Sequence, residues 1–299
     1  MPSQAPNNND NHAARPGTLY LVATPIGNLE DITLRALRIL KEVDLIACED
    51  TRQSKKLLAR YDIHKPLESY HEHNEAARAT ELLGRLKSGA KIALVSDAGT
   101  PLVSDPGNRL VSLCAENKIA VVPIPGPSAL TTALVGSGMD VSQFVFVGFL
   151  PARSGERRKE LQALAADPRT LIFYEAPHRL ALMLEDALEI LGDREAVIAR
   201  ELTKIHEEFR RGRLSDLANE LRSRAPRGEI TVIVGAGKAL SQSVHHDGIA
   251  PDVALPDRIK EVMHSQKLDQ KAALKQVARE RGLNKREAYK QLVAARDKS

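Results

Sequence analysis

Short apolar runs alternate with amphipathic segments through the first half of the chain. The runs are rich in Val, Ile and Leu, as buried strands are, while the segments between them carry apolar residues at helical spacing. The predicted strands are TLYLVAT (18–24), DLIACED (44–50), KIALVSDAGTP (91–101) and IAVVPIPGPSA (119–129). Helices are predicted over residues 29–43, 51–61, 73–89 and 105–118. In the last of these, Asp105 is the expected N-cap and Pro106 begins the first turn. This alternation predicts βαβ units and a largely parallel sheet.

The strands of the second half follow one another more closely, which predicts a mixed sheet. The predicted strands lie in FVFVGFLP (144–151), TLIFYEAPHRL (170–180), AVIARELTKIHEEFRRGRL (196–214, two strands and a loop) and GEITVIVGAG (228–237). A basic loop, ARSGERRK (152–159), is expected after the first, and ALMLEDALEIL (181–191) and LSDLANELRSRA (214–225) read as helices. The whole pattern predicts an α/β protein with two α/β domains.

Composition shifts divide the chain further. The expected parts are a polar, Asn-rich disordered leader (1–16), an N-terminal α/β domain (17–127), a C-terminal α/β domain (128–240), a Ser/His/Gly/Pro-rich linker (241–254) and a helical extension (255–299). The passage VPIPGPSAL (122–130) is the expected hinge between the α/β domains. Within the extension, three short helices and a turn at Gly282 and Leu283 give the spacing of a helix-turn-helix.

Charge is unevenly distributed. Residues 255–299 hold twelve Lys or Arg and six Asp or Glu, a net charge of +6, which leaves the rest of the +4 chain at −2. A basic appended segment suggests binding to a polyanion such as RNA, and the alternative is an ordinary solvated helical tail. No apolar run approaches the length of a membrane span, and the leader lacks the apolar core of a secretory signal. Two cysteines within apolar segments indicate free buried thiols, which fits a cytoplasmic protein.

Three loops that leave predicted strands share an unusual chemistry. ATPIGN (23–28), SDAGTPLVSDPG (96–107) and PIPGPSAL (123–130) combine Gly and Pro with small hydroxyl and carboxylate residues. Ligands of open α/β sheets bind beyond the carboxyl ends of strands, where such loops hold backbone groups close to a ligand. Each loop alone reads equally as a tight turn, but three at one edge favour a binding site.

Other motifs of chemistry are missing from the sequence. It has no phosphate-binding GxxxxGK[ST], no GxGxxG that opens a helix after the first strand, and no GxSxG. HExxH and paired CxxC motifs are also lacking, and His71 with His73 reads as loop surface, so the sequence predicts no metal site.

Seven motifs occur in order over roughly residues 17–237: LVATPIGNLEDITLRAL, CEDTR, SDAGTPLVSDPG, PIPGPSALTTAL, FVFVGFLP, FYEAPHR and ARELTKIHEEF. On these residues the chain resembles the tetrapyrrole methylase superfamily, and within it a branch that methylates ribosomal RNA and often carries a helical extension. The resemblance implies two α/β domains with S-adenosyl-L-methionine held in the cleft between them. It also implies methyl transfer to the ribose 2′-oxygen of a cytidine in the decoding region of 16S rRNA, in the 30S subunit, and a homodimer.

The resemblance places the cofactor against residues of both domains. Those implied are Ser96, Asp97, Ala98, Gly99, Thr100, Pro101, Ser128, Ala129, Phe149, Tyr174 and Leu202. The first loop departs from the glycine-rich loop of porphyrin-modifying relatives, so Pro25, Gly27 and Asn28 are expected to face a ribose rather than a tetrapyrrole.

The reaction itself suggests further residues. A ribose hydroxyl is a poor nucleophile and benefits from a general base, for which Asp105, Glu175 and Glu201 are candidates. Each can equally cap a helix or pair with an arginine. Phosphate or nucleotide contacts are predicted for Arg153, Arg157, Arg158, Lys159, Arg179, Arg200 and Lys204, whose alternative is a surface salt bridge. The rival functions are methylation of a small molecule or a protein on the same fold, and a non-catalytic RNA-binding assembly protein.

Overall fold

The computed structural model describes residues 16–221, 226–237, 255–266 and 269–280, together with Ala288 and Leu292. The predicted leader, apart from residue 16, and the predicted linker lie outside the described residues. Contacts divide the chain into two compact units, Met1–Gly237 and Lys238–Ser299. The first unit contains two five-stranded sheets, as the predicted fold class requires.

The first sheet is parallel throughout, in the order β3-β2-β4-β1-β5. Its strands and helices are β1 (Thr18–Val22), the 3-10 helix η1 (Leu29–Asp31), α1 (Leu34–Glu42), β2 (Leu45–Cys48), α2 (Thr51–Arg60), β3 (Leu67–Ser69), α3 (Glu75–Lys87), β4 (Lys91–Val95), α4 (Asn108–Glu116) and β5 (Ala120–Ile124).

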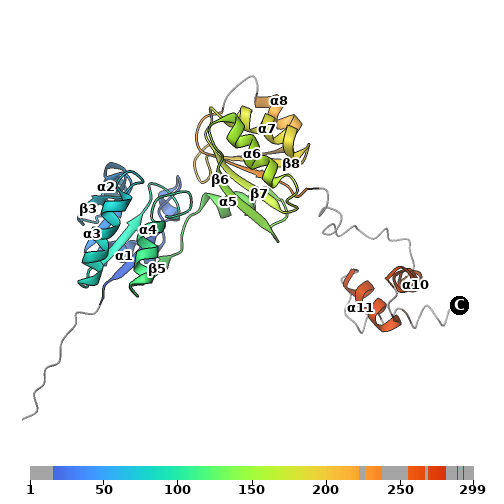
Figure 1. Ribbon diagram of the computed structural model, residues 1–299, viewed down its shortest axis with the longest axis horizontal. Coiled ribbons are helices and arrows are strands. Elements are labelled where there is room, and N and C mark those ends of the chain that lie inside the picture. The colour runs from blue at the N-terminus through green and yellow to red at the C-terminus, as the bar shows by residue number, and fades with distance from the viewer. Residues whose placement is uncertain are drawn as a thin grey trace, which may run out of the picture. The chain divides into compact units, whose positions relative to one another are not determined.

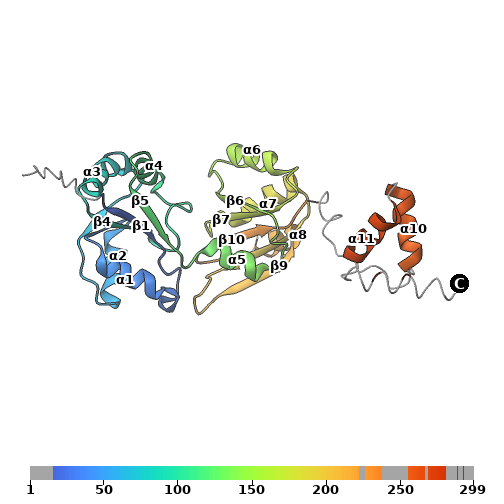
Figure 2. The ribbon, with the colours of Figure 1, turned by 90° about the horizontal axis from the view of Figure 1, so that it is seen from below.

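Helices cover both faces of this sheet (Figures 1 and 2). One buried cluster joins α3 and α4 to the sheet, and another joins α1 and α2 to its opposite face. Alternate side chains of a strand point to opposite faces, and both faces are covered here, so β2 is buried at all four positions. This explains why the strands read as continuous apolar runs.

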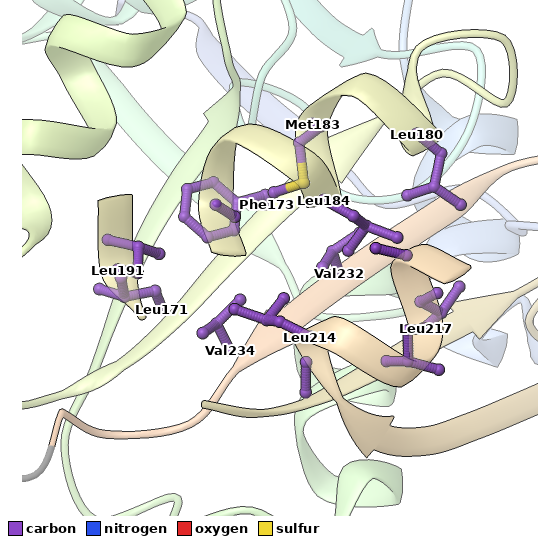
Figure 3. Packing of buried hydrophobic residues seen from close by; sticks show 14 of the residues in the cluster. Leu171, Phe173, Leu180, Met183, Leu184, Leu191, Leu214, Leu217, Val232 and Val234 are labelled. Carbon is purple, nitrogen blue, oxygen red and sulfur yellow. The ribbon is translucent and has the colours of Figure 1, made fainter. Parts of the chain in front are cut away.

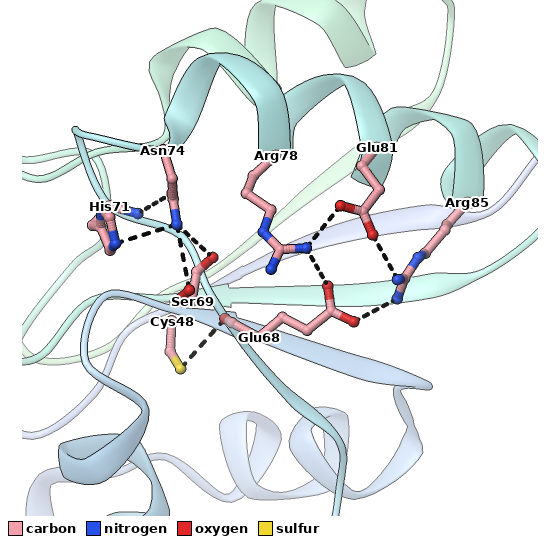
Figure 4. A network of polar contacts seen from close by, with 8 residues as sticks. All are labelled: Cys48, Glu68, Ser69, His71, Asn74, Arg78, Glu81 and Arg85. Atoms are coloured by element: carbon pink, nitrogen blue, oxygen red, sulfur yellow. Dashed lines mark hydrogen bonds and ion pairs between the residues drawn. The ribbon is translucent and has the colours of Figure 1, made fainter.

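Two local predictions for this domain were wrong. The segment expected as one helix over 29–43 is η1 followed by α1, because Thr33 breaks the run and caps α1 by accepting a hydrogen bond from the Ala36 backbone N–H at 3.1 Å. Strand β3 was not predicted, since LES carries no apolar run. It is an edge strand that ion pairs link to α3. Glu68 of β3 pairs with Arg78 and Arg85 of α3, and Arg85 also pairs with Glu81 (Figure 4).

The second sheet is mixed, as predicted. Its order is β6-β7-β10-β8-β9, with β6 parallel to β7 and the remaining pairs antiparallel. Its elements are α5 (Ala129–Ser137), β6 (Phe144–Phe149), α6 (Ser154–Leu164), β7 (Thr170–Glu175), α7 (Leu180–Leu191), β8 (Glu195–Arg200), β9 (Glu208–Arg213), α8 (Leu214–Leu221) and β10 (Ile230–Val234).

The larger core of this domain lies between the sheet and helices α6, α7 and α8. Phe173 of β7, Met183 of α7 and Val232 of β10 are fully buried there, and Leu214 of α8 closes the cluster (Figure 3). Helix α5 packs on the other face of the sheet, where a smaller cluster includes Ile26 from the first domain. Ile26 thus packs the first loop of the chain against the second sheet.

The basic loop predicted over 152–159 is wrong, because the chain is helical from Ser154. Residues Arg157 and Leu161 lie four apart on α6 and both turn inward. Arg157 is only 4 % exposed, and its guanidinium lies 2.7 Å from the Asp186 carboxylate of α7, which Arg158 also contacts. The segment therefore holds α6 against α7.

Replacing Arg157 with leucine should lower the free energy of unfolding by about 3 kcal/mol, because it leaves the Asp186 carboxylate buried beside only one cation. Urea denaturation measures the change. The matched control is Arg153→Leu, since Arg153 pairs with Glu156 on the surface and is 84 % exposed. That surface pair should contribute less than about 1 kcal/mol. Equal losses for the two variants would contradict the assignment.

The second unit contains α10 (Leu255–Gln266) and α11 (Gln270–Glu280). Ile259 and Val262 of α10 pack with Ala273 and Val277 of α11, and Ala288 and Leu292 join the same cluster. Two of the three predicted helices are therefore present. The predicted turn at 282–283, and Tyr289 and Val293 of the third helix, lie outside the described residues.

Candidate active site

The three loops singled out in the sequence leave adjacent strands of the first sheet. Strands β4, β1 and β5 are neighbours and parallel, so their carboxyl ends meet at one edge. Thr24 and Gly99 exchange two backbone hydrogen bonds of 2.9 Å, and the Thr100 hydroxyl donates to the Pro127 carbonyl at 3.0 Å. The loops thus meet at one edge of the sheet, as predicted, and they also hold one another in place.

Several residues of the 96–107 loop have positive φ, which is strained for the two that are not glycine. Gly99 has φ +82°, and Leu102 and Ser104 also have positive φ. Gly107, at φ +141°, is the N-cap residue of α4, which begins at Asn108. The predicted N-cap role of Asp105 is therefore wrong, because the loop continues for two more residues. Strain such as that at Leu102 and Ser104 concentrates at functional sites, and Asp105 of the same loop lines a cavity.

A cavity of about 420 Å³ lies where these loops meet the second sheet. It is lined by residues of both domains: Ile26, Asp97, Ala98, Gly99, Thr100, Val103, Ser104, Asp105, Ser128, Ala129, Phe149, Tyr174, Glu175, Ala176, Pro177, Ala199, Leu202, Gly228, Glu229, Ile230 and Thr231. The structure brings together all the predicted cofactor residues except Ser96 and Pro101. Ser96 is 4 % exposed, and its backbone carbonyl accepts a hydrogen bond from Thr24.

Aromatic side chains form one wall of the cavity. Tyr174 makes edge-on contacts with Phe146 and Phe149, whose ring centroids lie 5.0 and 5.6 Å away. The Tyr174 hydroxyl accepts a hydrogen bond from the Leu130 backbone N–H at 3.1 Å, which fixes the start of α5. Burial raises the pKa of Tyr174 to about 12, so the ring stays neutral.

The polar lining is acidic. Asp97, Asp105, Glu175 and Glu229 line the cavity, and no lysine or arginine of the described chain does. Burial is the main cause that raises the pKa of Asp105; a hydrogen bond with Ser96 opposes this rise, and the Asp97 charge adds to it. Glu175 and Glu229 are paired with Arg179 and Lys204 outside the lining. Asp97 and Asp105 form no ion pair among the described residues, and such carboxylates favour a positively charged ligand and repel a phosphate-bearing one.

The three candidate bases differ in their surroundings. Asp105 lines the cavity and forms no ion pair in the described chain. Glu175 also lines it, but it is 2 % exposed and bound to Arg179 at 3.1 Å and to the Ala176 N–H at 2.8 Å. Burial raises the pKa of Glu175 despite these contacts. Glu201 is outside the lining, and its hydrogen bond from Lys204 lowers its pKa. The geometry favours Asp105.

The residues expected to face the ribose do not line the cavity. Within ATPIGN only Ile26 does so. A Cβ on Gly27 would lie 2.4 Å from Cγ of Lys204, so this glycine allows the Lys204 chain to cross the loop. Asn28 caps η1 by accepting a hydrogen bond from Glu30 at 3.0 Å. Pro25 is half-buried outside the lining.

Most cations predicted to contact RNA are held in ion pairs. Arg179 binds Glu175, Arg200 binds Glu208 at 3.0 Å, and Lys204 bridges Glu201 and Glu229 at 2.8 and 3.2 Å. Arg158 contacts Asp186 and Glu189, as described for α6. Of the set, Lys159 alone is exposed without an ion pair within the described ranges.

Sequence reasoning missed the part of the lining that comes from β10 and the turn before it. Ile230 pairs with Glu175 of β7 and with Arg200 of β8 in antiparallel register. The amino end of β10 therefore meets the carboxyl ends of its neighbours, and Gly228, Glu229 and Thr231 reach the cavity. A rule based on carboxyl ends cannot find them. Ala176 and Pro177 stand in FYEAPHR, so that motif could have indicated them.

Comparison with known proteins agrees with this fold. Residues 18–218 match the tetrapyrrole (corrin/porphyrin) methylases. A protein of Halalkalibacterium halodurans named ribosomal RNA small subunit methyltransferase I is 49 % identical over 277 residues, which are 91 % of this chain and 93 % of that protein. A Thermotoga maritima protein of the same name is 52 % identical over 218 residues, 73 % of this chain and 98 % of its own length. Uroporphyrin-III C-methyltransferase from Thermus thermophilus, crystallised with S-adenosyl homocysteine, shares the fold with a TM-score of 0.53 at 22 % identity, over 73 % of this chain and 97 % of that one.

The family match and the relatives, together with the parallel sheet and the mixed sheet, identify a methyltransferase of the two-domain α/β type. The chain belongs to the tetrapyrrole (corrin/porphyrin) methylase family. In the described residues, no group of three or more His, Cys, Asp or Glu could hold a metal ion. No helix there is long and apolar enough to cross a membrane.

Proposed function

We propose that this protein is an S-adenosyl-L-methionine-dependent methyltransferase of ribosomal RNA, which methylates the ribose 2′-oxygen of a cytidine in the decoding region of 16S rRNA. The observation that carries the proposal is the acidic, partly aromatic cavity built from both domains of a methylase fold. The names of relatives that are 49 and 52 % identical support the small-subunit rRNA as acceptor. We also propose that the substrate is the 30S subunit, that the protein is a homodimer and that it is located in the cytoplasm.

The cavity fits the methyl donor. Its volume of about 420 Å³ falls within the roughly 300–1,000 Å³ typical of small-molecule sites. Phe149, Tyr174 and Leu202 offer apolar walls for adenine, and the cavity carboxylates suit a sulfonium cation. The donor, when bound, supplies an activated methyl group. The backbone of Ala98, Gly99 and Thr100 lines the same cavity and is held rigid by the Thr24 bridge, so it can orient the donor without rearrangement.

Asp105 is the proposed base for the acceptor hydroxyl. It faces the cavity, and no arginine or lysine of the described chain neutralises it. Its raised pKa brings it nearer to the value at which a carboxylate accepts a proton effectively. Glu175 is then a positioning residue, because its bonds to Arg179 and Ala176 hold the end of β7 beside the cavity.

The test is methyl transfer from radiolabelled S-adenosyl-L-methionine to 30S subunits and to deproteinised 16S rRNA, both from cells that lack the protein. Nuclease digestion followed by mass spectrometry should locate one 2′-O-methylcytidine in the decoding region. Methyl transfer to neither RNA, with donor binding intact in calorimetry, would reject the RNA acceptor. It would favour a small-molecule or protein acceptor instead.

The basic second unit is proposed to add RNA affinity rather than chemistry. About a quarter of this chain has no counterpart in the Thermotoga maritima relative, whose own length is matched almost completely. Deleting residues 255–299 should raise the Kd for 16S rRNA about tenfold at ~0.15 M salt and flatten its salt dependence, since fewer counterions are then released. Donor affinity, measured by calorimetry, should not change. An unchanged RNA affinity would contradict the role.

A further inference from the structure

RNA that enters the acidic cavity needs cations outside that cavity, and the first unit should contribute some of them beside the basic second unit. The cavity carries four carboxylates and no lysine or arginine in the described residues. The arginines beside it are engaged with Glu175 and Glu208. Their charges are therefore largely neutralised within the protein, and a different surface has to supply the contacts to RNA phosphates.

Helix α2 has such a surface. Its outward face carries Arg52, Lys55, Lys56 and Arg60, here called the α2 basic face, and the helix contains no acidic residue. Its opposite side, with Ser54 and Leu58, is buried against the sheet. Of these four cations, only Arg52 has a carboxylate partner among the described residues, and even its side chain is 86 % exposed.

On α1 and α3, in contrast, at least one cation is paired with a glutamate of the same helix. On α1, Arg38 pairs with Glu42 one turn away, and on α3, Arg85 pairs with Glu81 (Figure 4). On α2 the cations Arg52, Lys56 and Arg60 repeat at intervals of four residues, so like charges stack along one face. Like charges at this spacing destabilise an isolated helix. Their presence therefore favours a role in binding a partner over a role in stabilising the fold.

The α2 basic face begins next to the cavity. Asp50, the N-cap of α2, donates its backbone N–H to the Asp97 carboxylate at 3.0 Å, and Asp97 lines the cavity. The Asp50 carboxylate in turn holds the Arg52 guanidinium at 2.8 Å. From there the face continues along the helix, which covers the same side of the sheet as α1 (Figure 2). A strand of RNA leaving the cavity here would meet the four cations in succession.

We propose that the α2 basic face binds the phosphates of the RNA strand that carries the target nucleotide. This inference rests on the proposed function, because it names where the first unit holds that substrate. The recognition is electrostatic: extended side chains contact the backbone of the strand and position it, and they read no base. The face acts separately from the 255–299 segment, which belongs to the second unit.

The test is the full-length double variant K55Q/K56Q with a fluorescein-labelled 16S rRNA fragment that spans the decoding region. We expect the Kd to rise about tenfold at ~0.15 M salt and the slope of log Kd against log salt to fall by about two, one for each phosphate that is no longer neutralised. Donor affinity and kcat at saturating RNA should stay as in the wild type, and K55R/K56R should restore the binding.

The matched control is K87Q/K118Q, which removes the same charge from two exposed lysines of the same domain. Lys87 is the last residue of α3 and Lys118 lies two residues after α4, at the amino ends of the strands and opposite to the cavity. An equal loss in both double variants would show a nonspecific charge effect and overturn the proposal. So would unchanged RNA binding by K55Q/K56Q, or a loss seen with 30S subunits but not with naked rRNA, which would indicate a ribosomal protein as partner. If wild-type protein methylates no RNA, the proposed function has failed, whereas an active wild type with an unaffected variant rejects this inference alone.

Discussion

Gly99→Val should abolish measurable binding of S-adenosyl-L-methionine, with a Kd raised at least about a hundredfold. Gly99 lies at φ +82° in the cavity wall, and an added Cβ would already lie 3.2 Å from Cγ2 of Ile26. The two γ-carbons of valine would then take donor space or displace the Thr24–Gly99 bridge. A β-branched residue at this φ also adds strain of about 1–3 kcal/mol. Isothermal titration calorimetry with the donor measures the effect.

The chain offers a matched control for that strain. Gly138 has φ +79°, and a Cβ built on it meets no atom within 4 Å. It ends α5 outside the cavity lining. Gly138→Val should therefore lose a similar amount of unfolding free energy in urea while it binds the donor as the wild type does. Equal loss of donor binding in the two variants would mean that backbone strain, and not the shape of the cavity, explains the result.

The sequence predicted most of the fold because its signals are local and strong. Strands β2 and β4 of the first sheet are buried on both faces, so each appears as an almost unbroken apolar run. Strand β3 has no such run, since its residues Leu67–Ser69 are held at the edge through the charge network of Glu68. The break at Thr33 and the helical start at Ser154 were missed for a related reason. Both depend on single capping or buried contacts that a pattern of polar residues does not display.

The sequence predicted the parts of the candidate site that lie in loops directly after apolar strands. It did not predict the parts whose position depends on which strands pair in the sheet. The 96–107 and 123–130 loops were found because Gly, Pro and small polar residues follow apolar strands directly. The contribution of Gly228 and Thr231 depends on β10 running against β7 and β8, which no local pattern reveals. The burial of individual cations was likewise not predictable from the sequence. In the sequence, Arg157 and Lys55 are both simply cations. In the structure, Arg157 is buried against Asp186, whereas Lys55 is exposed without a partner in the described chain.

Asp105→Asn should lower kcat by about a hundredfold or more while donor affinity changes little. A neutral amide of the same shape cannot accept the proton of the acceptor hydroxyl, and general-base catalysis typically contributes factors of this size. In the wild type, the ionised carboxylate is the active form, so kcat should rise with pH. Because burial raises the pKa of Asp105, that rise should occur at higher pH than for an exposed aspartate. The variant should lose this acidic limb, and methylation of 16S rRNA across a pH series measures both effects.

Stability separates a catalytic role of Asp105 from a structural one. A carboxyl whose pKa is higher in the folded state contributes stability at low pH that is lost as the pH rises through that value. Asp105→Asn removes this loss, so its melting temperature at neutral pH should match or exceed that of the wild type. Glu175→Gln should instead melt at lower temperature, because it weakens the buried contact with Arg179. If Asp105→Asn melts at lower temperature and keeps its kcat, the carboxylate supports the loop and another group takes the proton.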